Sequence, residues 1–164
     1  MNLKNAFSLQ QGGAPPSFTG RTAASPAASA VKGRNRSKNT RAERELRKAL
    51  SKLGLRYRVH QRTLPGKPDI VFGKARIAVF CDGDFWHGRD WRARRSQLRK
   101  GSNADYWTQK IAYNIARDKR QAKQLKAANW SVIRFWETDV LRDPSAAADL
   151  VWRLLRRRIP DRVE

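Results

Sequence analysis

Cysteine and long apolar runs are nearly absent from this chain of 164 residues. Cys81 is the only cysteine, which excludes an internal disulfide, and without a Cys-x-x-Cys pair the usual thiolate zinc site is excluded as well. No apolar stretch has membrane-spanning length, and the first residues do not resemble a secretory signal. These absences predict a protein of the reducing cytoplasm that does not associate with membranes.

Acidic residues are also scarce, with 14 against 36 lysines and arginines, which gives a formal net charge of +22. A positive excess of this size attracts polyphosphates, so nucleic acid is the leading partner. Composition alone leaves open a merely basic surface, as found on ribosome-associated or membrane-surface proteins. With 40% hydrophobic residues, six Trp and six Phe, the chain can bury the core of one globular domain.

The N-terminal region contains no acidic residue, and Glu43 is the first in the chain. Residues 1–33 are rich in Ala, Ser, Pro and Gly and show no regular apolar period. We expect a disordered basic tail over 1–33 and a folded domain over 34–164. An organelle transit peptide is a less favoured alternative, because the stretch makes a poor amphipathic helix.

The rest of the chain predicts an α/β domain. Thr40 and Glu43 have capping-box spacing, and the apolar face of the helix they begin can be terminated by Gly54. The order is predicted to be α-β-β-β-α-β-α. The expected elements after this helix are strands at 57–59, 70–72 and 76–80, the last two a hairpin, then a polar loop at 82–103, a long helix at 107–125, a strand at 131–136 and a helix begun by Asp143 and Pro144.

Two carboxylates and a histidine stand at the ends of the predicted hairpin strands. Asp69 opens the apolar segment 70–72, Asp82 follows the next strand, and His87 lies in the loop beyond it. Carboxylate oxygens suit Mg²⁺, and a histidine with a near-neutral pKa suits proton transfer. Each has an ordinary alternative: Asp69 in a turn, Glu43 in its capping box, and His87 as a structural or surface residue. We assign His60 a structural role.

Four segments together resemble the very short patch repair (Vsr) mismatch endonucleases of the PD-(D/E)xK nuclease superfamily. They are RSKNTRAE at 36–43, LPGKPD at 64–69, DGDFWH at 82–87 and WSVIRFWE at 130–137. The resemblance implies a restriction-endonuclease-like core, in which a mixed central sheet is flanked by helices. It also implies a metal-dependent DNA endonuclease that nicks one strand, at or near T·G mismatches in DNA repair.

The resemblance also implies roles for single residues. Asp69 would be the central Mg²⁺ ligand, joined by the backbone carbonyl of Cys81, while Glu43 and Asp82 would act through bound water, for two Mg²⁺ ions in all. His87 would assist the attacking water. Phe85 and Trp86 would intercalate beside the mismatch, a task suited to adjacent aromatics in a loop, although both could instead belong to the core.

The expected partner is double-stranded DNA, bound by a monomer that other repair proteins assist. The helix face at 107, 111, 115 and 125 is expected to be core. The phosphate contacts are expected from basic residues outside that face, since net charge favours contact over a merely solvated surface. They are Arg36, Lys38, Arg94, Arg95, Lys110 and Arg117.

The sequence departs from the family pattern in three places. The positions of the family's structural zinc ligands hold Asp84, Arg89, Trp91 and Thr138, so we expect no zinc and a replacement of the metal by packing around Trp91. Lys32 stands where the family inserts a methionine into DNA. Phe80 and Asp82 stand where the superfamily has Glu and Lys. A restriction or defence nuclease on paired DNA, a catalytically silent DNA-binding protein and an RNA-associated protein remain the alternatives.

Overall fold

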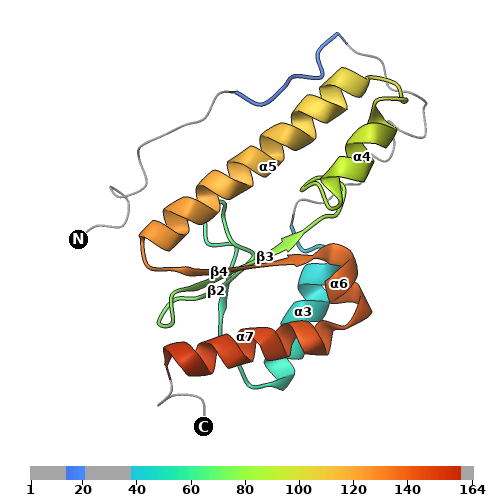
Figure 1. The fold of residues 1–164 in the computed structure, drawn as a ribbon. Coiled ribbons are helices and arrows are strands. Elements are labelled where there is room, and N and C mark those ends of the chain that lie inside the picture. Colours follow the sequence, from blue (N-terminus) through green and yellow to red (C-terminus); the bar gives the residue numbers. More distant parts are fainter. Residues whose placement is uncertain (1–13, 21–37, 160–164) are drawn as a thin grey trace.

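The structure is a computed structural model that describes residues 14–20 and 38–159. Its α/β architecture and mixed sheet confirm the predicted fold class, and the predicted order of elements is present with two further short helices, α4 and α6. Figure 1 shows the sheet between α5 on one side and α3, α6 and α7 on the other. The elements are α3 (Arg41–Lys52), β1 (Arg58–Val59), β2 (Ile70–Phe72), β3 (Ile77–Asp82), α4 (Trp91–Leu98), α5 (Ala104–Ala127), β4 (Ser131–Trp136), α6 (Glu137–Arg142) and α7 (Pro144–Arg158).

The ends of α3 confirm the local prediction. Thr40 Oγ1 accepts a hydrogen bond from the Glu43 amide at 3.2 Å, and the Glu43 carboxylate accepts one from the Thr40 amide at 3.2 Å. This reciprocal pair satisfies two amides that the first turn would otherwise leave without partners. Gly54 follows the helix with φ +70°, a conformation that glycine adopts without steric cost. The capping box therefore fixes Glu43 at the start of a rigid helix.

The sheet has the strand order β1-β2-β3-β4. β2 and β3 form the predicted antiparallel hairpin, with Phe72 opposite Ile77, and β4 lies parallel to β3. β3 extends to Asp82, two residues beyond the predicted end at Phe80, because Asp82 still pairs with Trp136 of β4. Residues that look like the start of a loop in the sequence are therefore held in the sheet.

The alternation of side chains along the strands divides the core into two clusters. Ile70, Phe72 and Val79 face α3 and α7, where Leu46 and Val151 are fully buried. The opposite face, formed by Val71, Ala78 and Phe80, packs against Leu125 of α5 and Trp130. Since side chains on a strand alternate between faces, Asp69 and Asp82 share the α5 face with Phe80.

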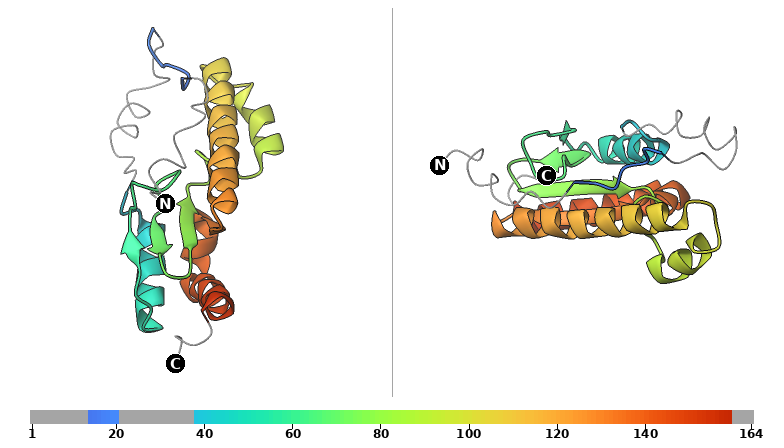
Figure 2. Two further views of the ribbon diagram at one scale, coloured as in Figure 1. Left: turned by 90° about the vertical axis from the view of Figure 1, so that its left-hand side faces the viewer. Right: turned by 90° about the horizontal axis from the view of Figure 1, so that it is seen from above.

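The predicted polar loop at 82–103 contains a helix, so that prediction was wrong for α4. None of the α4 residues is buried, and the helix therefore has no apolar stripe from which its period could be recognised. α4 lies beside the N-terminal half of α5 in both views of Figure 2. Within the described residues, no helix combines the length and apolarity needed to cross a membrane.

A polar network ties the loop after β3 to α6. Arg89 donates to Thr138 Oγ1, and its second nitrogen Nη2 donates to Asp139 at 3.0 Å. Thr138 in turn donates to Asp84 Oδ2 at 2.7 Å. Asp84, Arg89 and Thr138 are three of the four positions at which the sequence departs from the zinc-binding pattern. In this chain they hold the loop by hydrogen bonds and ion pairs, whereas Trp91 lies at the start of α4.

A short part of the N-terminal region also contacts the domain. The Phe18 ring lies 4.8 Å from the Tyr106 ring and 6.3 Å from the Trp107 ring, both at the start of α5. The rest of the predicted tail, including Lys32, lies outside the described residues.

Candidate active site

A cleft of about 1080 Å³ is lined by residues at the start of β2, at the end of β3, and on α3 and α5. Its walls contain all four residues that the sequence predicts to be catalytic, namely Glu43, Asp69, Asp82 and His87. They come from four separate segments, so the fold brings together side chains that are up to 44 residues apart in sequence. The cleft is therefore the candidate active site.

Asp69 lies at the start of β2 and is held by the neighbouring strand. Its Oδ2 accepts a hydrogen bond from the Cys81 amide at 2.8 Å. Burial, joined by the nearby charges of Glu43 and Asp82, raises the pKa of Asp69 to about 7 against the lowering effect of that hydrogen bond. Burial likewise raises the pKa of the Cys81 thiol, which makes it a poor thiolate ligand. The role predicted for the Cys81 carbonyl stays a prediction.

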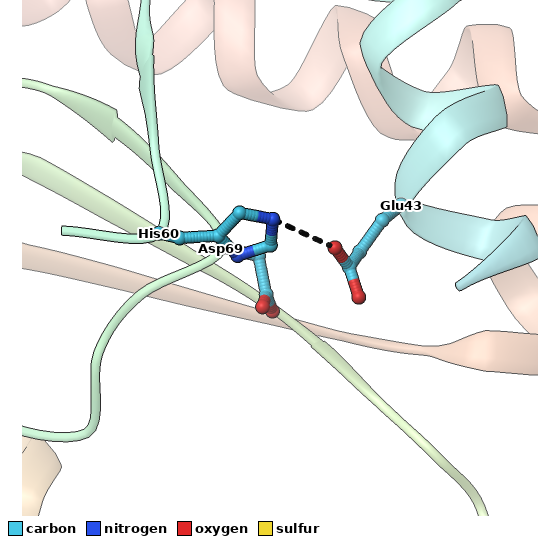
Figure 3. A group of neighbouring side chains, drawn as sticks. All are labelled: Glu43, His60 and Asp69. Atoms are coloured by element: carbon cyan, nitrogen blue, oxygen red, sulfur yellow. Dashed lines mark ion pairs between the residues drawn. The ribbon is translucent and has the colours of Figure 1, made fainter. Parts of the chain in front are cut away.

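Glu43 serves its capping box and faces the cleft at the same time. Its side chain is 3% exposed, and Oε2 accepts from the Asn39 amide at 2.9 Å. The same oxygen lies 3.6 Å from Nε2 of His60 (Figure 3). One ligand atom from each of Glu43, His60 and Asp69 lies within 4.8 Å of the other two. The structural and functional interpretations of Glu43 are thus compatible.

His60 is a site residue that sequence reasoning missed. It follows β1 directly, and its amide donates to the Asp69 carbonyl at 3.1 Å, which places the two residues side by side on neighbouring strands. The available signal for its proximity to Asp69 was its position, one residue beyond a strand that pairs with β2. That signal needs the register of β1 against β2, and a strand of two residues carries too little pattern to give it.

His87 is held by a partner that sequence reasoning also missed. Its Nδ1 lies 2.6 Å from Oδ2 of Asp118 on α5. Asp118 is buried on the apolar stripe of that helix, with spacings of seven and three residues from Ile111 and Ile115. Helical periodicity places this carboxylate among core positions, and a buried carboxylate needs a partner. The sequence therefore offered a signal for the pair.

The groups around Asp118 favour the ionised form of its carboxyl group. Burial alone would raise the pKa of Asp118, but the hydrogen bond from His87 and the charges of His87 and Arg134 outweigh it, so this pKa lies below its ordinary value. Arg117 adds a contact of 2.9 Å to Oδ1. An ionised Asp118 fixes the orientation of the His87 ring and leaves Nε2 as the nitrogen for other chemistry.

Asp82 is buried and paired with Arg134 of β4. The guanidinium donates from Nε at 2.6 Å and from Nη2 at 2.7 Å to the two carboxylate oxygens. Asp82 Oδ1 also lies 3.5 Å from Nδ1 of His87, and Arg134 Nη2 lies 3.5 Å from Asp118 Oδ2. Burial lowers the pKa of Arg134, but its bond to Asp82 more than offsets this. Sequence reasoning missed Arg134, although a charge inside an apolar strand was visible.

The predicted wedge residues form part of an aromatic cluster. The rings of Phe85 and Trp86 meet edge to face at 5.2 Å, and both contact Trp107 of α5, at 5.5 and 5.8 Å. Trp107 was expected in the core, yet it is partly exposed and supports these two rings. Trp86 also lines the cleft, and its carbonyl accepts from Asn114 at 2.9 Å. The cluster therefore stands at the rim of the candidate site.

Basic side chains surround the cleft and the aromatic cluster. Of the predicted phosphate contacts, Lys38 and Arg117 line the cleft, and the Arg94 guanidinium lies over the Phe85 ring at 5.6 Å. Arg95 is exposed on α4, Lys110 lies on α5, and Arg36 falls outside the described residues. Besides Arg134, the cleft adds four basic residues that sequence reasoning did not single out, namely Arg41, Arg44, Arg62 and Lys67.

The donors near Asp69 fit a divalent cation. Two carboxylates, the buried Glu43 and the partly buried Asp69, lie close enough for the charge of Glu43 to disfavour that of Asp69. Asp82, by contrast, already has Arg134. A cation between Glu43, Asp69 and His60 would offset the repulsion, and oxygen and imidazole donors are ordinary ligands for such an ion.

Comparisons with known proteins agree with this geometry. The sequence profile of the family described as DNA mismatch endonuclease Vsr matches residues 24–93. The chain is 43% identical to the Type II nicking enzyme V.NmeDIP of Neisseria meningitidis serogroup C, over 74% of this chain and 81% of that protein.

Two further relatives are also similar to this chain. The Type II nicking enzyme V.HpaIIP of Haemophilus parainfluenzae is 43% identical over 70% of this chain and 79% of its own length. The DNA mismatch endonuclease Vsr of Escherichia coli K12 is 35% identical over 62% of this chain and 69% of its own length. With this identity over most of both chains, and with the predicted residues assembled in one cleft, the protein belongs to the Vsr family of DNA endonucleases.

Proposed function

We propose that this protein is a Mg²⁺-dependent endonuclease that nicks one strand of double-stranded DNA at or near T·G mismatches. One observation carries the proposal: a single basic-rimmed cleft holds the Glu43 and Asp69 carboxylates opposite the His87–Asp118 pair. A cation site facing an oriented imidazole is what hydrolysis of a phosphodiester requires. The names of the relatives, which describe nicking and mismatch enzymes, support the same reaction.

The residues divide the work between two sides of the cleft. Asp69 and Glu43 would hold the cation, which when bound would neutralise the negative charge that develops on the phosphate oxygens. On the opposite side, Asp118 keeps the His87 ring oriented through Nδ1, and Nε2 accepts a proton from the attacking water. Arg134 neutralises Asp82 beside them. Because Asp82 is already paired with Arg134, we propose one Mg²⁺ ion, at Asp69, and no second ion.

Recognition of a mismatch falls to the aromatic cluster. A mismatched pair is easier to unstack than a matched one, so a wedge of Phe85 and Trp86 enters there at lower cost. The Trp107 ring packs against both of these rings and supports them. Lys38, Arg94, Arg95, Lys110 and Arg117 supply phosphate contacts along the duplex. We expect a cytoplasmic monomer that works on chromosomal DNA with other repair proteins.

The decisive experiment is nicking of a duplex that carries one T·G mismatch, beside the same duplex fully paired. Each strand carries its own label, so that a nick is distinguished from a double-strand cut. We expect Mg²⁺-dependent cleavage of one strand of the mismatched duplex, and a loss of roughly a thousandfold in Asp69→Ala, since metal stabilisation is worth several kcal/mol. Asp149→Ala, which alters an exposed aspartate of α7, is the matched control and keeps full activity.

The outcomes separate the alternatives. Equal cleavage of both duplexes would keep the nuclease and replace mismatch repair by a restriction or defence role, which the names of the Type II nicking relatives also allow. Tight binding without cleavage of either duplex would make the protein a silent DNA-binding member of the family. Cleavage that survives in Asp69→Ala would place the metal elsewhere.

A further inference from the structure

The site holds a nitrogen donor that a site for Mg²⁺ alone does not need. His60 lies beside Asp69 on the neighbouring strand, and Figure 3 shows its imidazole close to the Asp69 and Glu43 carboxylates. Nε2 lies 3.6 Å from Glu43 Oε2. Three donors from α3, the end of β1 and the start of β2 thus converge on one point.

The hydrogen bonds of His60 are too weak to account for the position of its ring. Its distance of 3.6 Å to Glu43 is too long for a hydrogen bond, and its bond to Asn39 Oδ1, at 3.5 Å, is at the limit. Asn39 Oδ1 already accepts from Arg47 at 2.9 Å. The ring is therefore close to two acceptors and well bonded to neither.

The spacing suits ligands of one ion. Donors that bind a cation at about 2.1 Å are at most about 4.2 Å apart, on opposite sides of it. The three donors of this group lie within 4.8 Å of one another, so they meet that limit after a shift of a few tenths of an ångström. The side chain of His60 is 20% exposed, which leaves the ring room to move.

We propose that His60 is a direct ligand of the catalytic cation and makes the site prefer a first-row transition-metal ion, with Mn²⁺ as the probe, over Mg²⁺. Mg²⁺ favours oxygen donors and binds imidazole poorly, whereas divalent transition metals accept imidazole nitrogen readily. The inference rests on the proposed function, because it concerns the ion at Asp69. It adds the chemical class of that ion and a third ligand.

The test measures cation binding without DNA or turnover. Calorimetric titration of the full chain with MnCl₂ and with MgCl₂ gives both affinities, and pulsed electron paramagnetic resonance of bound Mn²⁺ reports a directly bound nitrogen. We expect Mn²⁺ to bind at least about tenfold more tightly than Mg²⁺. In His60→Ala we expect a loss of about tenfold or more for Mn²⁺, little change for Mg²⁺, and no nitrogen signal.

Two further variants keep the result interpretable. His60 has φ +48°, a conformation that Asn also tolerates, so His60→Asn removes the imidazole while preserving the backbone. His87→Ala removes the only other histidine, whose Nδ1 is held by Asp118, and should leave the Mn²⁺ affinity and the nitrogen signal unchanged. A nitrogen signal that persists in both His60 variants would overturn the inference, as would Mn²⁺ affinity that they do not lower.

Asp69→Ala separates this inference from the proposed function. If Asp69→Ala abolishes Mn²⁺ binding and the His60 variants do not weaken it, the inference fails while the metal site of the proposed function stands. If Asp69→Ala binds Mn²⁺ as the unaltered protein does, the site itself is wrong and both fail. If Mn²⁺ binds through His60 but no DNA is cleaved, the inference stands and the proposed function fails.

Discussion

The two sides of the cleft differ in how their charges are matched. On one side Asp82, Arg134, His87 and Asp118 form a connected set in which each carboxylate has a hydrogen-bond partner within 2.7 Å. On the other side one ligand atom from each of Glu43, His60 and Asp69 lies within 4.8 Å of the other two, and burial raises the pKa of Asp69 to about 7. The carboxylates of the first side are therefore paired within the fold, whereas those of the second side would be paired by the proposed cation.

This difference separates the two requirements of hydrolysis. Preorganised polar groups lower a barrier only if they are already in place, and the paired side satisfies that condition without a ligand. The unpaired side holds two carboxylates that repel each other, and the proposed cation would offset that repulsion.

The largest effect is expected on the paired side from His87→Ala. Loss of general-base assistance typically lowers a rate by 10²–10⁴-fold, so kcat for nicking should fall within about that range. Asp118→Asn should also lower kcat, because the amide cannot hold the imidazole in the same protonation state, as an aspartate can. Single-turnover nicking and Mn²⁺ titration check this together. An altered Mn²⁺ affinity in either variant would contradict the separation of the two sides.

Arg134→Met should be the most destabilising change in the cleft. It leaves Asp82, which is 5% exposed, without its cationic partner, and removing one member of a buried pair typically costs about 3–5 kcal/mol. Denaturant unfolding should therefore show a loss near the lower end of that range, because His87 remains close. The double variant Asp82→Leu with Arg134→Met removes both charges and should recover most of the stability. A double variant no better than Arg134→Met would show that Arg134 acts by packing.

These pairs also show what the sequence could and could not predict. The capping box of α3, the β2–β3 hairpin and the strand at Ser131–Trp136 follow from local patterns, and the structure confirms them. The partners of the candidate residues do not. His87 and Asp118 are 31 residues apart, and Asp82 and Arg134 are 52 apart.

Such pairs form because the register of β3 against β4 and the docking of α5 bring them together, and no local pattern encodes either. The sequence did contain indirect signals. Asp118 occupies a core position on an amphipathic helix, and Arg134 interrupts an apolar strand, so each required a buried partner of opposite charge. His60 gave no such signal, because the strand before it has only two residues.

On the unpaired side, Asp69→Asn should stabilise the protein when no divalent cation is present. The pKa of Asp69 is raised by burial from 3.8 to about 7, so the folded state binds the proton more tightly than the unfolded state does. Stability is therefore lost as the pH rises from about 4 to about 7, and the penalty is complete above 7. Asn carries no charge, so in EDTA at pH 8 the variant should gain roughly 1–3 kcal/mol.

The pH dependence provides the control for this variant. The gain in Tm should shrink as the pH is lowered from 8 to 4, and added Mn²⁺ should stabilise the unaltered protein while leaving Asp69→Asn unchanged. Thermal unfolding at several pH values measures both. A gain that is independent of pH would show that Asn improves packing, and would remove the argument that this side of the cleft stores charge repulsion.

The smallest effect is expected outside the cleft, in the network that ties the loop after β3 to α6. Thr138 accepts from Arg89 and donates to Asp84 at 2.7 Å, so Thr138→Val removes two hydrogen bonds while keeping the shape of the side chain. These groups are exposed, and the Tm should fall by only about 1–3 °C.

The same measurement tests whether the network does the work of a metal. A loop held by Asp84, Arg89 and Thr138 needs no ion, so in protein purified without added divalent cations, 1,10-phenanthroline should leave the Tm unchanged to within about 1 °C. Loss of a structural zinc would instead lower the Tm by much more than Thr138→Val does, because metal binding at such sites is folding free energy. A large fall in Tm with the chelator would show that this loop depends on a bound cation. Dependence on a cation would then no longer be confined to the Glu43–Asp69 side of the cleft.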